Sequence, residues 1–127
     1  MSINIHESAE NYLEAILALG ETGHPVRSID VAQHLGFSKP SVSRAMSLLR
    51  EGGFVAVDAG GFLRLTDDGM EIAQRIYERH LLLTKWLVHL GVSEDVAVQD
   101  ACRIEHDLSV ESFDALREHI NRDMGLA

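Results

Sequence analysis

The sequence predicts a mainly helical protein in which one β-hairpin interrupts a series of amphipathic helices. Two observations support this fold class. Apolar residues recur with the 3.6-residue period of an α-helix over most of the 127-residue chain. One short segment near the middle has no such period and alternates strand-like with turn-forming residues. Because 46% of the residues are hydrophobic, the chain can bury the core of one ordinary domain or of two small units.

Two short helices are expected to follow a longer first helix. The first helix runs from about residue 8 to residue 19, where apolar side chains recur at the helical period. Ser28 is the expected N-cap of a short helix over residues 29–35, which ends at a glycine. Ser38 is the expected N-cap of the next helix, which has Pro40 in its first turn. Two short helices joined by such a tight turn are typical of a helix-turn-helix.

A β-hairpin is predicted directly after this motif. Residues 54–57 and 62–65 are apolar and strand-like, and the turn formers of residues 58–61 separate them. A hairpin next to the second helix of a helix-turn-helix is a wing. The N-terminal half is therefore expected to be a winged helix-turn-helix.

Three helices are predicted in the C-terminal half. Thr66 is the expected N-cap of a long helix that reaches Gly91. Ser93 opens a second helix that continues to about residue 108, and Ser109 caps a last amphipathic one. The expected order of elements is three helices, two strands and three helices.

Charge and composition argue against a membrane-spanning protein and against a protein that binds nucleic acid over most of its surface. Eleven Lys and Arg against 20 Asp and Glu give a net charge of −9, which opposes binding to DNA or anionic lipid over most of the surface. Residues 38–50 are the exception, because they contain three cations and no acid. Every apolar run in the sequence, including residues 81–83, is too short to span a membrane. A single cysteine and the lack of a secretion-type N-terminal segment lead us to expect a cytoplasmic protein.

The cationic segment coincides with the second helix of the predicted helix-turn-helix, whose first residues contact bases and phosphates in the major groove. Lys39 and Arg44 can neutralise phosphate, and Arg44 has the planar fork that pairs with guanine. Arg64 on the predicted wing adds a backbone contact. The alternative is an exposed helix whose serines and cations only contact solvent. The predicted DNA-binding residues are Ser38, Lys39, Pro40, Ser41, Ser43, Arg44 and Arg64.

A second group of residues has the donor types of a transition-metal site. Cys102, Glu105 and His106 are spaced i, i+3 and i+4, which places thiolate, carboxylate and imidazole on one face of the predicted helix. This mixture suits a first-row divalent ion. His80 continues the apolar face of the long helix, and Glu14 on the first helix could complete the site. Taken singly, the alternatives are a hydrogen-bonded core histidine, a buried cysteine and a solvated helix face.

Six segments, spread in order over nearly the whole chain, carry a family resemblance. They are ENYLEAI (10–16), DVAQHL (30–35), SKPSVS (38–43), LTDDG (65–69), RH (79–80) and DACRIEHDLS (100–109). In these segments the chain resembles the diphtheria toxin repressor and manganese transport regulator family of metal-dependent transcriptional repressors.

The resemblance implies a winged helix-turn-helix DNA-binding domain over residues 1–68 and a helical metal-binding and dimerisation domain over residues 69–127. It implies a homodimer that binds a double-stranded DNA operator, is activated by Fe(II) or Mn(II), and represses metal-uptake genes. We expect the dimer contacts to include Trp86, Leu87, Phe113 and Leu116. By position, the metal ligands that the resemblance implies are Cys102, Glu105, His106, His80, Glu14 and Asn11.

The sequence mixes two branches of that family. Iron-type members have Cys at the position of Cys102 but Met at that of Asn11, whereas manganese-type members have Glu and Asp there and Glu at the position of Glu14. Thr84 and Val98 replace further ligands of the iron-type branch, so the ancillary site of that branch is not expected in the same form. The chain is also expected to be a short form without the SH3-like domain of longer members.

Three other functions fit parts of this pattern. A winged-helix regulator that does not depend on metal would differ in whether the 102–106 segment binds an ion at all. A helical metalloenzyme of the di-iron type needs Glu-x-x-His pairs on two helices, whereas Glu105 and His106 are adjacent. A protein-interaction module leaves the cations of residues 38–50 unexplained. We therefore expect a transcriptional regulator and no enzymatic activity.

Overall fold

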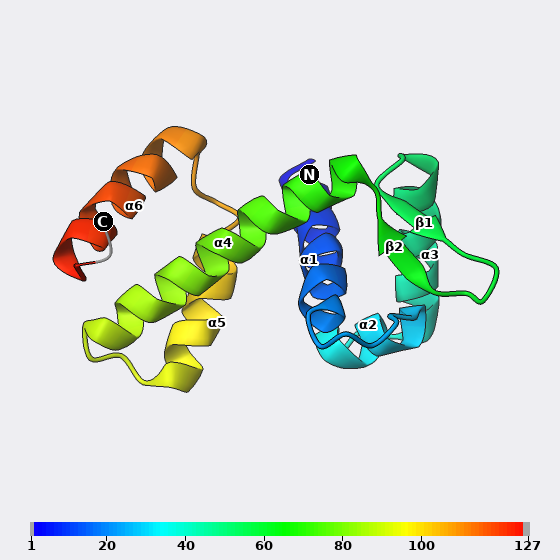
Figure 1. Ribbon diagram of the computed structural model, residues 1–127, viewed down its shortest axis with the longest axis horizontal. Helices are drawn as coiled ribbons and strands as arrows, with labels where there is room; N and C mark the ends of the chain where they lie inside the picture. The colour runs from blue at the N-terminus through cyan, green and yellow to red at the C-terminus, as the bar shows by residue number, and fades with distance from the viewer. Residues whose placement is uncertain (1, 126–127) are drawn as a thin grey trace. The chain divides into compact units, whose positions relative to one another are not determined.

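The computed structural model describes residues 2–125, with side chains from residue 8 onward. Over this range the chain forms six helices and two strands in the predicted order (Figure 1), so the mainly helical fold class is confirmed. The chain divides into two compact units, Met1–Arg75 and Ile76–Ala127, and the division falls within one helix.

The first unit contains the winged helix-turn-helix. Its helices are α1 (Ser2–Gly20), α2 (Ser28–Leu35) and α3 (Lys39–Glu51). Strands β1 (Val55–Val57) and β2 (Leu63–Leu65) pair antiparallel and form the wing. The first helix begins earlier than residue 8, where we expected it to start.

Three helix ends of the helix-turn-helix were predicted from the sequence, and two of them, the end of α2 and the start of α3, are as predicted. Gly36 ends α2 in the left-handed region at φ 71°, which glycine adopts without strain. Ser38 caps α3, because its hydroxyl oxygen accepts a hydrogen bond from the amide of Ser41. At the start of α2, however, the N-cap is Arg27 and not Ser28. The Asp30 carboxylate accepts the Arg27 amide at 2.9 Å, so the acid in the first turn closes this end.

The root of the wing packs closely against the beginning of the long helix α4 (Asp67–His89). Thr66 donates its hydroxyl to the carbonyl of Gly53 at 2.6 Å, and its amide bonds the carbonyl of Phe54 at 3.1 Å. A Cβ atom at Gly69 would overlap that same Phe54 carbonyl oxygen. Thr66 Oγ1 also accepts the amide of Gly69 at 3.2 Å and so caps α4, and Gly69 lets the two backbones approach, which together explain the LTDDG segment.

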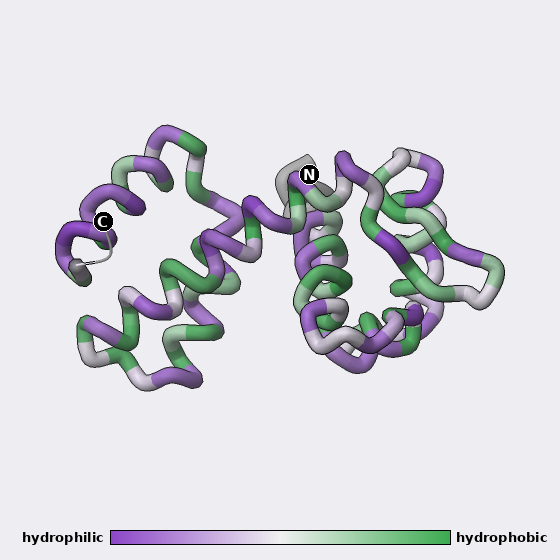
Figure 2. The backbone as a smooth tube through the Cα atoms, viewed as in Figure 1, coloured by the Kyte–Doolittle hydropathy of each residue, from purple (hydrophilic) through white to green (hydrophobic). Residues whose placement is uncertain are grey.

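A single apolar core holds the first unit together. Hydrophobic residues recur along each of its helices (Figure 2), and those that face inward are buried. Val26 forms an isolated bridge to Leu63, which ties the connector before α2 to the wing. The sequence analysis did not predict that bridge. The core residues include Leu13, Ile16, Val31, Val42, Met46, Leu49, Val55, Leu63 and Ala73.

The second unit contains the C-terminal part of α4 together with α5 (Glu94–Ile104) and α6 (Val110–Asp123). Leu83, Ala101 and Phe113 form its buried cluster. The helix predicted to continue to about residue 108 instead ends at Ile104. Among the described residues, no helix is long and apolar enough to cross a membrane.

Candidate metal centre and nucleic-acid interface

The predicted metal ligands of the second unit lie where α5 ends. Cys102 is in the last turn of α5, Glu105 is its C-cap, and His106 is in the following turn. The expectation that all three lie on one face of a continuous helix is therefore wrong for His106. The three side chains nevertheless converge, because one ligand atom from each lies within 4.8 Å of the others.

Burial differs sharply among the donors. The side chains of Glu105 and His106 are 0% and 1% exposed, whereas Cys102 is exposed. Glu105 Oε1 lies 3.4 Å from His106 Nε2. From α4, the ring of His80 brings Nδ1 to within 3.0 Å of Glu105 Oε2. One buried carboxylate is thus contacted by two imidazoles from different elements.

The donor set fits a divalent transition metal. Apart from its 3.4 Å contact with His106 Nε2, the buried Glu105 Oε1 has no hydrogen-bond partner among the described residues, and burial of an incompletely paired carboxylate oxygen is costly. A bound cation would remove that cost. Thiolate and imidazole suit iron, zinc and copper, and carboxylate suits manganese and iron, so the residues fit the ions that the resemblance implies.

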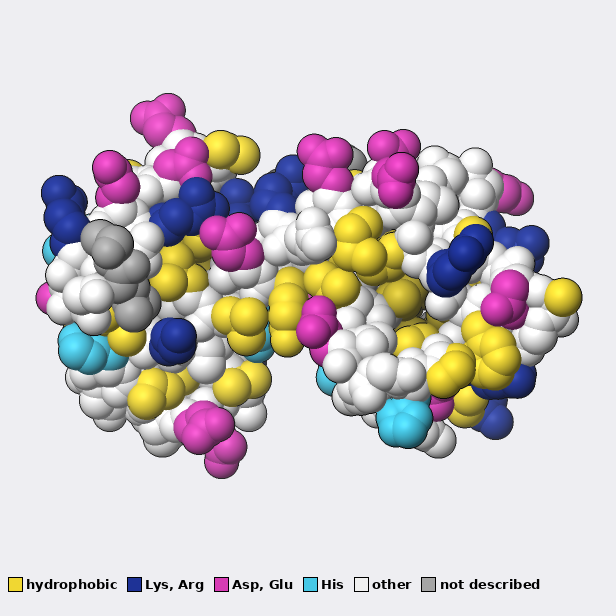
Figure 3. Space-filling model, viewed as in Figure 1, with side chains coloured by type: hydrophobic (Ala, Val, Ile, Leu, Met, Phe, Trp, Pro, Cys, Tyr) yellow, Lys and Arg dark blue, Asp and Glu magenta, His cyan; other side chains and the backbone are white. Residues whose placement is uncertain are grey.

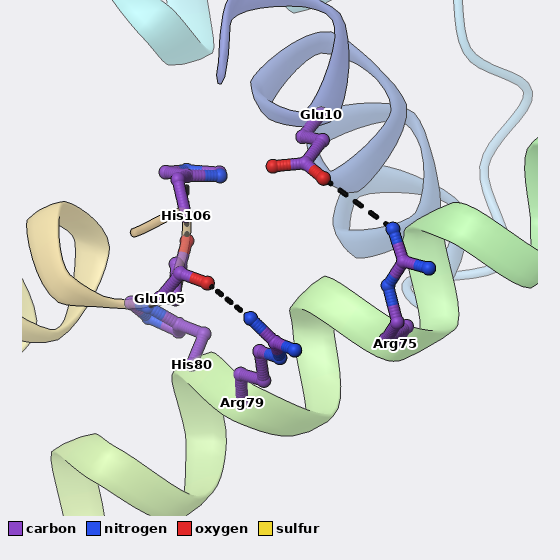
Figure 4. A network of polar contacts seen from close by, with 6 residues as sticks. All are labelled: Glu10, Arg75, Arg79, His80, Glu105 and His106. Atoms are coloured by element: carbon purple, nitrogen blue, oxygen red, sulfur yellow. Dashed lines mark hydrogen bonds and ion pairs between the residues drawn. The ribbon is translucent and has the colours of Figure 1, made fainter. Parts of the chain in front are cut away.

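Arg79, which the sequence analysis quoted only as part of the RH segment and gave no role, also contacts this site. Its Nη1 donates to the carbonyl oxygens of Glu105 at 2.9 Å and Leu108 at 2.8 Å. Figure 4 shows Arg79 and His80 extending from α4 toward Glu105. The available signal was a cation at helical spacing between the apolar Ile76 and Leu83, where a solvated charge is not expected.

The two remaining predicted ligands belong to the first unit. Asn11 and Glu14 are both half-buried on α1, three residues apart and therefore on one side of that helix. Glu10 on the same helix forms an ion pair within its own unit, with Arg75 of α4 at 3.4 Å.

The predicted DNA-binding residues lie on the surface of the first unit. All six from α3 and its cap are exposed, and so is Arg64 on β2. Figure 3 shows Lys and Arg side chains along the side of this unit that carries α3 and the two strands. Ser38 and Ser41 are also bonded to each other, with 2.8 Å between their hydroxyl oxygens.

The residues expected at a dimer interface are not equivalent. Phe113 is only 2% exposed and belongs to the core of the second unit, so a partner could not contact it without repacking. Trp86, Leu87 and Leu116 are half-buried. Other apolar side chains of the same unit are more exposed, among them Leu81, Val88, Leu90 and Val110.

Comparison with known proteins identifies the family. The N-terminal DNA-binding domain of the iron-dependent repressors matches residues 4–60, and their metal-binding and dimerisation domain matches residues 66–122. The transcriptional regulator MntR of Escherichia coli is 34% identical over 111 residues, which are 87% of this chain and 72% of that protein. A helix-turn-helix-type transcriptional regulator of Methanocaldococcus jannaschii is 32% identical over 87% of this chain and 90% of its own length.

A solved structure agrees with these sequence matches. A manganese-dependent transcriptional repressor in complex with manganese superposes with a TM-score of 0.77 at 31% identity, over 94% of this chain. The match covers 53% of that structure, so the chain spans about half of its length. The resemblance found in the sequence is thereby confirmed. The chain belongs to the iron-dependent repressor family of transcriptional regulators.

Proposed function

We propose that this protein is a metal-activated repressor that binds double-stranded operator DNA as a homodimer when Fe(II) or Mn(II) is bound. The observation that carries the proposal is the buried Glu105 carboxylate, one oxygen of which has no hydrogen bond among the described residues. Cys102 and His106 each bring a donor atom within 4.8 Å of it. Residues 1–68 would bind DNA, and residues 69–127 would bind metal and form the dimer. We propose that the protein acts in the cytoplasm.

The proposed ligands are the six residues that the family resemblance implies. Cys102, Glu105, His106 and His80 supply one thiolate, one carboxylate and two imidazoles from the second unit. Glu14 and Asn11 would add a carboxylate and a neutral amide oxygen from α1. When bound, the ion would supply positive charge that offsets part of the acidity of the chain.

DNA is contacted by cationic residues of the first unit. Lys39 and Arg44 at the exposed start of α3, with Arg64 on the wing, provide the cations that contact phosphate and bases. A regulator switched by metal must favour its DNA-competent state by several kcal/mol on binding the ion. We infer that the ion selects one arrangement of the two DNA-binding units of a dimer.

Dimerisation follows from the need for specificity. One winged helix-turn-helix contacts only a short stretch of DNA. In a dimer, the two copies of the recognition helix α3 would lie about one turn of the DNA apart and contact the two halves of a pseudo-palindrome. Trp86, Leu87 and Leu116 remain proposed contacts, because they retain accessible surface. The exposed Leu81 and Val88 extend the apolar surface of α4.

The decisive experiment is an anaerobic titration of the purified chain with Fe(II) or Mn(II). DNA duplexes selected from a random library in the presence of each ion serve as probes in a mobility shift. We expect retardation with metal and its loss on adding chelator. Affinity for the selected DNA that is unchanged by chelator would instead indicate a winged-helix regulator that does not depend on metal.

A further inference from the structure

We propose that Arg79 is a positioning residue for the metal centre, because it fixes the main chain of the turn that carries Glu105 and His106. The inference rests on the proposed function, since it names a residue that supports the same site. Arg79 itself would not bind the ion. It would hold the Glu105 carboxylate in place before the ion arrives.

The contacts of Arg79 close the turn that follows α5. Carbonyl groups at the end of a helix have no partner within that helix. Arg79 Nη1 lies 2.9 Å from the carbonyl oxygen of Glu105 and 2.8 Å from that of Leu108. One guanidinium from α4 therefore joins both ends of residues 105–108. This turn also contains His106, so its conformation sets the position of two proposed ligands.

Neighbouring residues of α4 hold Glu105 at two different places. Arg79 binds its carbonyl oxygen, whereas His80 approaches its carboxylate with Nδ1 3.0 Å from Oε2 (Figure 4). Successive residues of a helix point in directions about 100° apart, so the two side chains reach separate parts of Glu105. With its backbone and its side chain both held, the carboxylate has little freedom to move away from the site.

The burial of Arg79 argues for a geometric role. Arg79 is only 5% exposed, and its guanidinium lies 4.9 Å from the ring centroid of Phe113, which is 2% exposed. Burying a charge is expensive, and an apolar side chain of similar volume is often as stabilising. An apolar residue would nevertheless leave the buried Glu105 carbonyl without its donor. The arginine is thus the residue type that fills this space and also fixes the turn.

Arg117 provides a matched control in the same unit. It extends from α6 and lies over the same Phe113 ring, also at 4.9 Å. Its ion pairs are to Glu78 at 3.1 Å and Asp114 at 3.3 Å, and no bond from it to residues 105–108 occurs in the described part of the chain. Replacing Arg117 removes a comparable stacking cation and leaves the ligand-bearing turn untouched.

The test compares full-length wild type, Arg79→Gln, Arg79→Lys and Arg117→Gln. Anaerobic titration with Co(II) reports metal affinity and, through thiolate-to-cobalt absorption, the geometry at Cys102. Thermal unfolding of each metal-free protein reports stability separately. We expect Arg79→Gln to weaken Co(II) binding by about 10- to 100-fold, as removal of supporting contacts around ligands generally does. Arg79→Lys should recover part of the loss, because its ammonium keeps the charge and N–H donors for the carbonyls of Glu105 and Leu108 but lacks the planar guanidinium that fixes the direction of the donor.

Arg117→Gln should lower the unfolding temperature and keep Co(II) affinity close to that of wild type. The inference is overturned if the folded Arg79 variants bind Co(II) as tightly as Arg117→Gln does, or if Arg117→Gln weakens binding to the same extent. Should Arg79→Gln fail to fold, the comparison of Arg79→Lys with Arg117→Gln decides in the same way. Absence of Co(II) binding by wild type would overturn the proposed function itself and this inference with it.

Discussion

His80 and Glu105 are 25 residues apart in the sequence, yet His80 Nδ1 lies 3.0 Å from Glu105 Oε2. This contact brings α4 and the end of α5 to one carboxylate within the second unit. The other oxygen of that carboxylate is buried and faces His106 Nε2 at 3.4 Å. Substitution of Glu105 should therefore impair metal binding more than substitution of any other proposed ligand.

Neutralising Glu105 should abolish activation by metal. In Glu105→Gln the amide keeps nearly the same volume but supplies no charge, and in His106→Ala an imidazole donor is lost. We expect metal-dependent DNA retardation to disappear in both variants. His24→Ala is the control, because His24 is exposed in the connector between α1 and α2 and does not belong to the second unit, which carries the Cys102, Glu105 and His106 cluster. Retention of full activation by Glu105→Gln would contradict the assigned centre.

The choice of metal should depend on Cys102 and Asn11. A thiolate favours softer ions and a neutral amide adds no charge, so Fe(II) should activate DNA binding better than Mn(II), with Zn(II) a tight competitor. The double variant Asn11→Asp with Cys102→Glu should shift the preference toward Mn(II). Activation curves with each ion, read by mobility shift, measure the change.

A single variant tests whether the sulfur of Cys102 contacts the ion at all. Cys102→Ala should weaken Fe(II) binding and metal-dependent DNA binding together. Because Cys102 is exposed, this change should have little effect on the stability of the metal-free protein. Unchanged metal affinity and unchanged DNA binding in Cys102→Ala would remove Cys102 from the ligand set.

The cations of the recognition helix should differ in what they contribute. Lys39→Ala removes a point charge and should weaken binding across all sequences, with the salt slope reduced by about 1. Arg44→Ala should weaken binding and also relax sequence preference, because its fork can read a guanine. Lys85→Ala, an exposed lysine of the second unit, is the control. Binding measured at several salt concentrations on selected and random duplexes separates the two effects.

The glycine at the start of α4 should be intolerant of any side chain. A Cβ at Gly69 overlaps the carbonyl oxygen of Phe54, so Gly69→Ala should lower the free energy of unfolding by on the order of 2 kcal/mol. Gly20→Ala is a matched control, since a Cβ there meets nothing within 4 Å. Urea denaturation of both variants makes the comparison, and equal stabilities would show that the wing root can move away.

The sequence predicts every helix and the hairpin, because caps and apolar periodicity are local signals. Ser38 and Ser109 cap α3 and α6 as expected, since each hydroxyl needs only an amide three residues ahead. The early end of α5 was missed. It is associated with Arg79, a donor 26 residues away from Glu105, and a contact of that length leaves no periodic trace.

The candidate site shows the same division between local and distant information. The Cys102, Glu105 and His106 cluster was predicted from spacing and occurs in the structure, although His106 lies beyond the helix. The burial of Phe113 was not predicted, because an apolar face of an amphipathic helix is equally suited to its own core and to a partner. Only the packing of α6 in the second unit distinguishes these alternatives.

The unequal burial of the donors also bears on how such a regulator can change during evolution. Glu105 is enclosed on all sides, so a different residue there would disturb packing, hydrogen bonding and charge at once. Cys102 lies at the exposed edge of the cluster, where side chains of other sizes can be accommodated. Mutations at position 102 can therefore alter which ion a descendant responds to while the fold that holds the ion is inherited intact.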